Sequence, residues 1–431
     1  MRFKLIIILA TILFFFGGIS HLSYYQSSSS SATSSSSTGS SHGRSSTGTT
    51  TIDNRINDHF TNTPTHKNDH NDKHVEVDDH NNNHKNIQPT PTPEFKPTIF
   101  VSLASYRDVW CSDTINYLFK NADHPENVFI GLVDQGSELL EVVEPEHPSY
   151  PNSLCYRGLT VSPELIKSNV RRVTLEKDKA RGPTLARHLA STLYRNEMYF
   201  MQIDSHLRFI KGWDTFAMSN HWSLRGIAPT CKHGVPKAIL THYPMPWEES
   251  NPGLPSDDQH QVPRLCKAIF HDQGLITFNS FILPATKIPK ECPFAAAGFF
   301  FAPGEIMDSV PYDPHLPNMF EGEEILHSAR LWAAGFRFYG PTLNLCYHYY
   351  IREKHPKFWD DNKTYYNEMS DSTERGKYIL GLVHDEVDLT LPKYSELDKY
   401  GMSKKTAADF WNYIEVNIPL NTQNESKWCT N

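Results

Sequence analysis

The stretch that decides the fold runs Tyr199-Phe200-Met201-Gln202-Ile203-Asp204-Ser205-His206. Its first five residues are apolar except for Gln202, and they have the length and composition of a buried strand. The predicted strand ends abruptly in an acid, a small residue and a histidine. Residues directly beyond the carboxyl end of a parallel strand are where open α/β sheets bind ligands. We therefore expect a ligand site at Asp204 and His206.

Strands and helices alternate on both sides of this stretch. The sequence predicts strands over 98–104, 128–133, 170–175 and 199–203, and helices over 109–121 and 182–193. Such alternation is typical of βαβ units, so we expect an α/β fold with a mostly parallel sheet. Later segments are less regular, with strands expected over 237–242, 295–302 and 336–346 and a helix over 321–334. Residues after about Asp360 show no clear period.

The N-terminal part differs in composition from the rest. Residues 1–4 are predicted to be a cytosolic tail, 5–25 a signal anchor, and 26–96 a low-complexity stem of Ser, Asn, His and Pro that cannot build a core. The alternative to the anchor is a cleaved signal peptide, because the apolar stretch is short for a membrane span. The absence of a small-x-small cleavage site favours the anchor. In both cases the folded domain, 97–360 with an extension over 361–431, enters the secretory lumen.

Charge and cysteine content narrow the classes of protein. The net charge of -8 argues against a nucleic-acid-binding surface. Seven cysteines without a C-x-x-C pair argue against a zinc site. Disulfides suit an oxidising lumen, but their pairing stays open and one thiol is left over. The tripeptides Asn362-Lys363-Thr364 and Asn424-Glu425-Ser426 are glycosylation sequons, which give weak support to that compartment.

Asp204 and His206 are spaced so that both can reach one divalent cation. Side chains alternate along a strand, so Ser205 between them should point away. A carboxylate with an imidazole suits manganese better than calcium or magnesium, and such a cation can hold a diphosphate. The alternative is an aspartate that makes a turn beside an ordinary histidine, because a bare D-x-H is a weak pattern.

Three further groups could carry chemistry. Glu321, Glu323 and Glu324 open a helix, where they either complement its dipole or face a substrate. Arginines neutralise phosphates but are also common on surfaces. The candidates of this type are Arg107, Arg181 and Arg187. His348 could complete a metal site, although a histidine among aromatic residues is more often a core residue.

Several runs, taken in order, resemble a known family. They are 99–108, 204–209 with 212–214, 299–302, 311–314 and 320–324. Together they are similar to glycosyltransferases that add N-acetylglucosamine in α linkage to protein hydroxyls, among them a cytosolic enzyme that acts on hydroxyproline of Skp1 and Golgi enzymes for mucin-type polypeptides. A more distant similarity is to polypeptide N-acetylgalactosaminyltransferases. Their Asp-x-His metal motif matches Asp204 and His206, and their Arg-Gly-x-x-x-Ala-Arg segment resembles 181–187.

The resemblance implies a GT-A fold, a UDP-sugar donor, manganese and retention of anomeric configuration, with 97–360 as the catalytic domain. It implies metal ligands at Asp204, His206 and His348, although His355 follows closely and competes with His348. It implies donor contacts, which would come from Ser105, Arg107, Arg187 and Asp204. Glu323 and Glu324 would be the catalytic pair that orients donor or acceptor.

The N-terminal segment departs from the cytosolic Skp1 enzyme and resembles a Golgi type II membrane protein. We therefore expect N-acetylglucosamine transfer from UDP-GlcNAc onto Ser/Thr hydroxyls of luminal Ser/Thr-rich polypeptides. One alternative is a polypeptide N-acetylgalactosaminyltransferase, and another is a hydroxyproline enzyme of the Skp1 type. A membrane-tethered carbohydrate-binding or adhesion protein without catalysis is the non-enzymatic alternative.

Overall fold

The computed structural model describes residues 97–136, 155–231, 234–250, 254, 261–271, 274–352, 355–383 and 385–430. All of them lie in one compact unit, Pro89–Asn431. The predicted tail, anchor and stem over 1–4, 5–25 and 26–96 lie outside the described residues. Among the helices that are described, none is long and apolar enough to cross a membrane.

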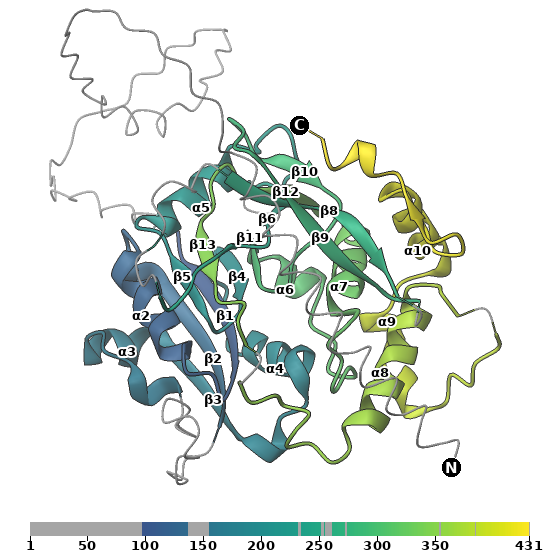
Figure 1. Cartoon of the computed structure of the whole chain (residues 1–431), viewed down its shortest axis with the longest axis horizontal. Helices are drawn as coiled ribbons and strands as arrows, with labels where there is room; N and C mark the ends of the chain where they lie inside the picture. The colour runs from purple at the N-terminus through teal and green to yellow at the C-terminus, as the bar shows by residue number, and fades with distance from the viewer. Residues whose placement is uncertain are drawn as a thin grey trace, which may run out of the picture. The chain divides into compact units, whose positions relative to one another are not determined.

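An eight-stranded sheet forms the centre, in the order β10-β12-β6-β11-β4-β1-β2-β3 (Figure 1). Four neighbouring strands are parallel: β1 (Ile99–Tyr106), β2 (Val128–Gly136), β3 (Val170–Glu176) and β4 (Tyr199–Ile203). β11 (Phe299–Pro303) runs antiparallel between β4 and β6 (Ala238–Thr241). β12 (Arg337–Gly340) is parallel to β6, and β10 (Lys290–Cys292) closes the edge antiparallel to β12. The expected α/β class with a mostly parallel sheet is confirmed.

Helices cover both faces of this sheet. Leu132 of β2 belongs to the main core with residues of α2 (Cys111–Asn121). The next residue, Val133, packs instead with alanines of α4 (Gly182–Ser191). Because successive strand residues face opposite sides, α2 and α4 lie on opposite faces (Figure 1).

The remaining elements are three smaller sheets, further helices and short turns. A three-stranded sheet combines β5 (Leu207–Phe209), β13 (Cys346–His348) and β7 (Met245–Pro246). Two antiparallel pairs follow, β8 (Gln261–Phe270) with β9 (Ile276–Pro284), and β14 (Val416–Asn417) with β15 (Thr422–Gln423). The other helices are α3 (Pro163–Asn169), α5 (Trp213–Trp222), α6 (Ile306–Ser309), α7 (Glu323–Ala333), α8 (Tyr365–Ile379), α9 (Leu397–Tyr400) and α10 (Lys404–Tyr413). Short 3₁₀ turns occur at Pro125–Asn127, Cys155–Gly158, Lys177–Lys179, Pro392–Tyr394 and Glu425–Lys427.

The elements that the sequence predicts least well lie in the C-terminal half. The strand residues expected within 336–346 belong to two strands, β12 and β13, which lie in different sheets. The β8–β9 hairpin is absent from the sequence-based expectations. α8 has no clear apolar period because its buried positions are Ser372, Arg375, Gly376 and Ile379. A helix whose buried face is small and charged does not show the usual hydrophobic pattern.

The structure contains two disulfides, whose pairing the sequence left open. Cys111 pairs with Cys155, and Cys266 of β8 pairs with Cys429 near the C-terminus. Cys231, Cys292 and Cys346 are buried thiols. The second disulfide fixes the C-terminal segment to the β8–β9 hairpin.

Candidate active site

A cavity of about 470 Å³ lies where the parallel strands β1 and β4 end. Its wall includes the residues that follow β4, the start of α7 and the segment before α8. The lining residues that matter below are Tyr106, Arg187, Asp204, His206, Tyr243, Gly298, Phe320, Glu323, Glu324, His348, Arg352, Lys357 and Trp359. The ligand site predicted at the carboxyl end of β4 therefore coincides with a cavity of the size that binds small molecules.

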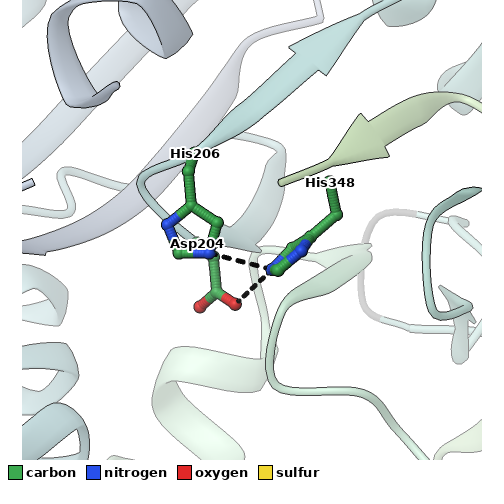
Figure 2. A group of neighbouring side chains, drawn as sticks. All are labelled: Asp204, His206 and His348. Atoms are coloured by element: carbon green, nitrogen blue, oxygen red, sulfur yellow. Dashed lines mark hydrogen bonds and ion pairs between the residues drawn. The ribbon is translucent and has the colours of Figure 1, made fainter. Parts of the chain in front are cut away.

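Asp204, His206 and His348 form a cluster in this wall (Figure 2). His348 Nε2 lies 3.0 Å from His206 Nε2 and 3.3 Å from Asp204 Oδ2. Asp204 and His206 come from the short link between β4 and β5, whereas His348 ends β13. Antiparallel pairing of β13 with β5 places His348 opposite Leu207 and so beside His206. His355 lies outside the cluster, with its ring 5.8 Å from that of Tyr349.

The donor atoms of this cluster fit a divalent cation. Burial, together with Arg352 and His348, lowers the pKa of His206 to about 4, so its imidazole is neutral at pH 7. Ligand atoms at right angles around a cation, each about 2.1 Å from it, lie about 3.0 Å apart, which matches the two Nε2 atoms. A carboxylate with two imidazoles suits manganese among the common cations.

Gly298 leaves room for the Asp204 carboxylate. A Cβ at this position would lie 2.9 Å from Asp204 Oδ2, which is closer than real Cβ contacts. The backbone at Gly298 also accepts a hydrogen bond from Asp204 N at 3.1 Å. The small residue before β11 is therefore part of what positions the predicted metal ligand.

Asp108, which the sequence analysis did not single out, orients His206. Its buried Oδ2 lies 2.7 Å from His206 Nδ1 and accepts a hydrogen bond from Ser205 Oγ at 2.8 Å. Desolvation opposes its ionisation, but Arg352 and His206 hold the pKa of Asp108 well below its usual range. A carboxylate on Nδ1 fixes the tautomer that turns Nε2 toward the cluster.

The Ser205 hydroxyl donates to Asp108 Oδ2, on the Nδ1 side of His206, and not to an atom of the cluster, in line with the prediction that Ser205 points away from the cation. Ser205 and His206 bond to the same carboxylate, and Ser205 also lines the cavity. β4 ends at Ile203, so the alternation of a strand does not continue through Asp204, Ser205 and His206.

Arg187 of α4 connects the metal-ligand cluster with the acidic helix start. Its Nη2 lies 2.8 Å from Asp204 Oδ1, and its Nη1 donates to Glu323 Oε1. Burial disfavours its charge, but Glu323 and Asp204 together raise the pKa of Arg187. Arg187 is thus a buried cation whose partners are protein carboxylates.

Glu324, the next residue, has only neutral hydrogen-bond donors around its carboxyl group. The Tyr243 hydroxyl donates to Oε2 at 2.6 Å, and Ala297 N donates to Oε1 at 2.8 Å. Burial raises the pKa of Glu324 to about 7, against the lowering effect of these donors. Glu323 and Glu324 therefore face the same cavity with different tasks, since Glu323 fixes Arg187 and Glu324 can change charge near neutral pH.

Ser105 and Arg107, which are predicted to contact the UDP-sugar, do not line the cavity. Ala104 and Tyr106 line it, and Ser105 between them faces the other side of β1 and is buried. Arg107 pairs with Asp361 at 3.0 Å. The alternation of side chains along a strand could have predicted that Ser105 faces away from the cavity. No sequence pattern could have predicted the ion pair of Arg107, because Asp361 is more than 250 positions away in sequence.

Arg352 and Lys357 line the cavity, and the sequence analysis missed both. Lys357 Nζ donates to the Arg352 carbonyl at 2.6 Å, and Arg352 Nη2 lies 3.4 Å from Asp108 Oδ2. Burial, with the charge of Arg352, lowers the pKa of Lys357 to about 8. Both cations come from the irregular segment after β13, where no periodic pattern marks a position.

The family described as Glycosyltransferase (GlcNAc) matches residues 98–143 and 142–419. A search of curated proteins found no match.

Two solved structures are similar at low identity. GalNAc-T7 with UDP, GalNAc and Mn²⁺ is 15% identical with a TM-score of 0.48, and the match covers 77% of this chain and 58% of that one. TarS 1–349 of S. aureus in complex with UDP-GlcNAc is 12% identical with a TM-score of 0.36, and the match covers 73% of this chain and 72% of that one. This chain therefore spans less than two thirds of GalNAc-T7, and neither likeness says what this chain binds.

The family match carries the assignment, because it runs through nearly all of the described residues and includes the cavity, the Asp204 cluster and the start of α7. The chain belongs to the Glycosyltransferase (GlcNAc) family.

Proposed function

We propose that this protein is a Golgi type II membrane enzyme that transfers N-acetylglucosamine from UDP-GlcNAc, with retention, onto Ser/Thr hydroxyls of luminal polypeptides. The observation that carries the proposal is the Asp204–His206–His348 cluster in the wall of a 470 Å³ cavity. Membership of a GlcNAc glycosyltransferase family supports the sugar. Two disulfides support the oxidising compartment.

Manganese would be held by Asp204, His206 and His348. When bound, it supplies positive charge that stabilises a leaving diphosphate. Arg352 and Lys357 line the same cavity, Arg352 beside Asp108, and both can donate to phosphate oxygens. Arg187 bonds to the carboxyl groups of both Asp204 and Glu323 and helps to lower the pKa of Asp204, so it acts on the site of the UDP-sugar through them. Burial raises the pKa of Glu323, against the lowering effect of Arg187.

The acceptor hydroxyl needs orientation more than a strong base. In a retaining front-face reaction, the departing phosphate oxygen can accept the hydroxyl proton. Glu324 is suited to hold a hydroxyl of the donor sugar or the acceptor, because its carboxyl group faces the cavity and is fixed by Tyr243 and Ala297. Glu323 is suited to fixing the α7 start against α4 through Arg187.

A row of aromatic side chains at the cavity mouth supports a polypeptide acceptor. Phe320 and Trp359 line the cavity, are 57% and 37% exposed, and have ring centroids 6.0 Å apart. The row continues from Trp359 to Tyr365 at 6.0 Å and to the exposed Tyr366 at 5.2 Å. Exposed apolar patches beside a cavity indicate binding, and aromatic rows are typical of surfaces for extended, Pro-containing chains.

The decisive experiment is a transfer assay with the purified full-length chain. UDP-GlcNAc and UDP-GalNAc compete as donors onto Thr and hydroxyproline peptides, with and without manganese. We expect GlcNAc on the Thr peptide, dependent on manganese and lost in Asp204→Ala. Preference for UDP-GalNAc or for hydroxyproline would select one of the two enzymatic alternatives.

The assay also separates an enzyme from a binding protein. If the chain neither transfers nor hydrolyses any UDP-sugar, and does not bind UDP with manganese, a carbohydrate-binding or adhesion role replaces the enzymatic proposal. Co-localisation with a Golgi marker and protection of the folded part from added protease test the membrane placement.

A further inference from the structure

Two glycosylation sequons occur in the chain, and both have a hydrogen bond from the hydroxyl of the third residue to the asparagine side chain. In Asn362-Lys363-Thr364, the Thr364 hydroxyl donates to Asn362 Oδ1 at 3.0 Å. In Asn424-Glu425-Ser426, the Ser426 hydroxyl donates to Asn424 Oδ1 at 2.7 Å. Because this bond is common to both sequons, the surroundings of each asparagine decide whether it can carry a sugar in the folded protein.

Asn362 is enclosed. It is 7% exposed, and its Nδ2 donates to Oδ1 of Asn318 at 2.9 Å in the interior. Asn318 in turn donates to Glu368 Oε2 at 2.7 Å, and Glu368 also pairs with Arg181 at 3.2 Å. A sugar on Nδ2 would need space that this network and its neighbours occupy. Asn362 is therefore a structural residue that closes a polar network next to the cavity rim.

Asn424 lies open at the surface. The residue is exposed, as are Ser426 and Lys427 after it. Its Nδ2 donates one hydrogen to Glu415 Oε2 at 2.5 Å, which leaves the second N–H of the amide for substitution. The position lies between β15 and Cys429, whose disulfide to Cys266 ties the segment to the hairpin.

We propose that Asn424 carries an N-linked oligosaccharide and that Asn362 does not. The co-reactant is an oligosaccharide on a lipid diphosphate, supplied in the lumen. The Asn424 Nδ2–C1 bond forms as the C1–O bond to the diphosphate breaks. The lipid diphosphate leaves with the bonding electrons, and one amide proton is released to the transferase base. The proposal rests on the luminal placement given under the proposed function, and not on the sugar-transfer activity.

The chain offers a matched control at Asp388. The substitution Asp388→Asn completes a third sequon with the natural Leu389 and Thr390, in an exposed turn. Thr390 already donates to Asp388 Oδ1 through its hydroxyl at 2.6 Å, as in the two natural sequons. This variant tests whether the region reaches the glycosylating compartment, independently of Asn424.

The test expresses the full-length chain in cultured eukaryotic cells and compares its electrophoretic mobility before and after peptide-N-glycosidase treatment. We expect one glycan on the wild type, none on Ser426→Ala or Asn424→Gln, one on Thr364→Ala and two on Asp388→Asn. Thr364→Ala removes the sequon but keeps the Asn362 amide that Asn318 needs. Conversion of Asn424 to an aspartate during enzymatic release in ¹⁸O water, read by mass spectrometry of the wild type, gives the site without any substitution.

Three results would overturn the proposal. A glycan that survives Ser426→Ala and disappears in Thr364→Ala reverses the assignment. A wild type without a glycan, beside a glycosylated Asp388→Asn, shows that Asn424 is not used although the region is luminal. The absence of glycans from every variant overturns the luminal placement as well, while leaving the transfer assay on the purified chain as the separate test of activity.

Discussion

Asp204 and Glu324 both line one cavity, but their surroundings shift their pKa values in opposite directions. For Asp204, desolvation opposes ionisation, but His348, Arg187 and His206 together hold its pKa well below the usual range. For Glu324, burial raises the pKa to about 7, and its direct partners Tyr243 and Ala297 are neutral. Both residues are acids in the cavity wall, so the charge of their partners accounts for the difference.

The contrast assigns different chemistry to the two walls. A carboxylate that is ionised at every physiological pH is suited to a cation that must stay bound. A carboxyl group that titrates near neutral pH is suited to hold a hydroxyl, as donor or as acceptor, during the reaction. The following substitutions exchange or remove these features, in order of decreasing expected effect.

Asp204→Asn should have the largest effect. It keeps the shape of the side chain but removes the negative charge that the cation and Arg187 both need. We expect a loss of about 10³-fold in kcat, the order found when a main electrostatic contact of the transition state is removed. The measurement is manganese-dependent transfer, with the exposed Asp398→Asn, which creates no sequon, as a control of equal chemistry. Retention of activity within a few-fold would show that Asp204 is not a metal ligand.

Asp108→Asn should have a smaller effect, because it weakens manganese binding only through His206. The substitution leaves His206 in place but removes the carboxylate that fixes its Nδ1 at 2.7 Å. Loss of such a partner typically costs about 10- to 100-fold in metal affinity. The measurement is a manganese titration of activity, in which kcat at saturating manganese should recover much of its wild-type value. A lower plateau with an unchanged manganese requirement would contradict a positioning role.

The sequence predicts the parallel half of the molecule well. Tyr199–Ile203 is predicted and observed with the same bounds, because it is a fully buried strand and its apolar run stops at an acid. The position of Asp204 and His206 beyond that strand follows from the general geometry of parallel sheets. This part of the site depends on local sequence, so a local pattern is enough to find it.

The rest of the site depends on contacts between distant segments. Asp108 reaches His206 from 98 positions away, and Glu323 reaches Arg187 from 136 positions away. Arg352 and Lys357 come from irregular chain with no period, and strand alternation turns Ser105 to the face of β1 that lies away from the cavity. Propensity and periodicity describe neighbours along the chain, so they carry no information about the pairings between distant residues.

Glu324→Gln tests the other wall and should have a moderate effect. A neutral amide cannot ionise, so transfer should fall about 10-fold, the value of one hydrogen bond to a charged group. In the wild type, activity should rise with pH through about 7 as Glu324 ionises, and this rise should be absent from the variant. Tyr243→Phe removes a donor that favours the carboxylate, so it should shift the rise to higher pH.

The substitution Glu324→Gln should also change how the free energy of unfolding depends on pH. The folded-state pKa of Glu324 is raised from 4.5 to about 7, so the folded protein binds this proton more tightly than the unfolded chain does. Stability from this group is present below about pH 4.5 and is lost as pH rises through 7. Glu324→Gln should therefore be more stable than the wild type at pH 8, by up to about 3 kcal/mol, and similar to it at about pH 4.5. Equal stability of the two proteins at about pH 8 would show that the group is solvated.

The smallest effect that we predict concerns two histidines of the core, away from the metal cluster. His221 and His242 are fully buried, and burial lowers the pKa of each to about 4. In the unfolded chain these histidines bind protons below about pH 6.5, whereas in the folded protein they bind them only below about pH 4. The free energy of unfolding should therefore fall as pH falls from about 6.5 to 4.

The substitution His242→Leu removes one such group. It should reduce the loss of unfolding free energy between about pH 7 and 5 by up to about 2 kcal/mol. Urea unfolding at the two pH values measures this difference, with the exposed His124→Asn as the control. An equal loss in His242→Leu and the wild type would mean that His242 is protonated in the folded protein over this range.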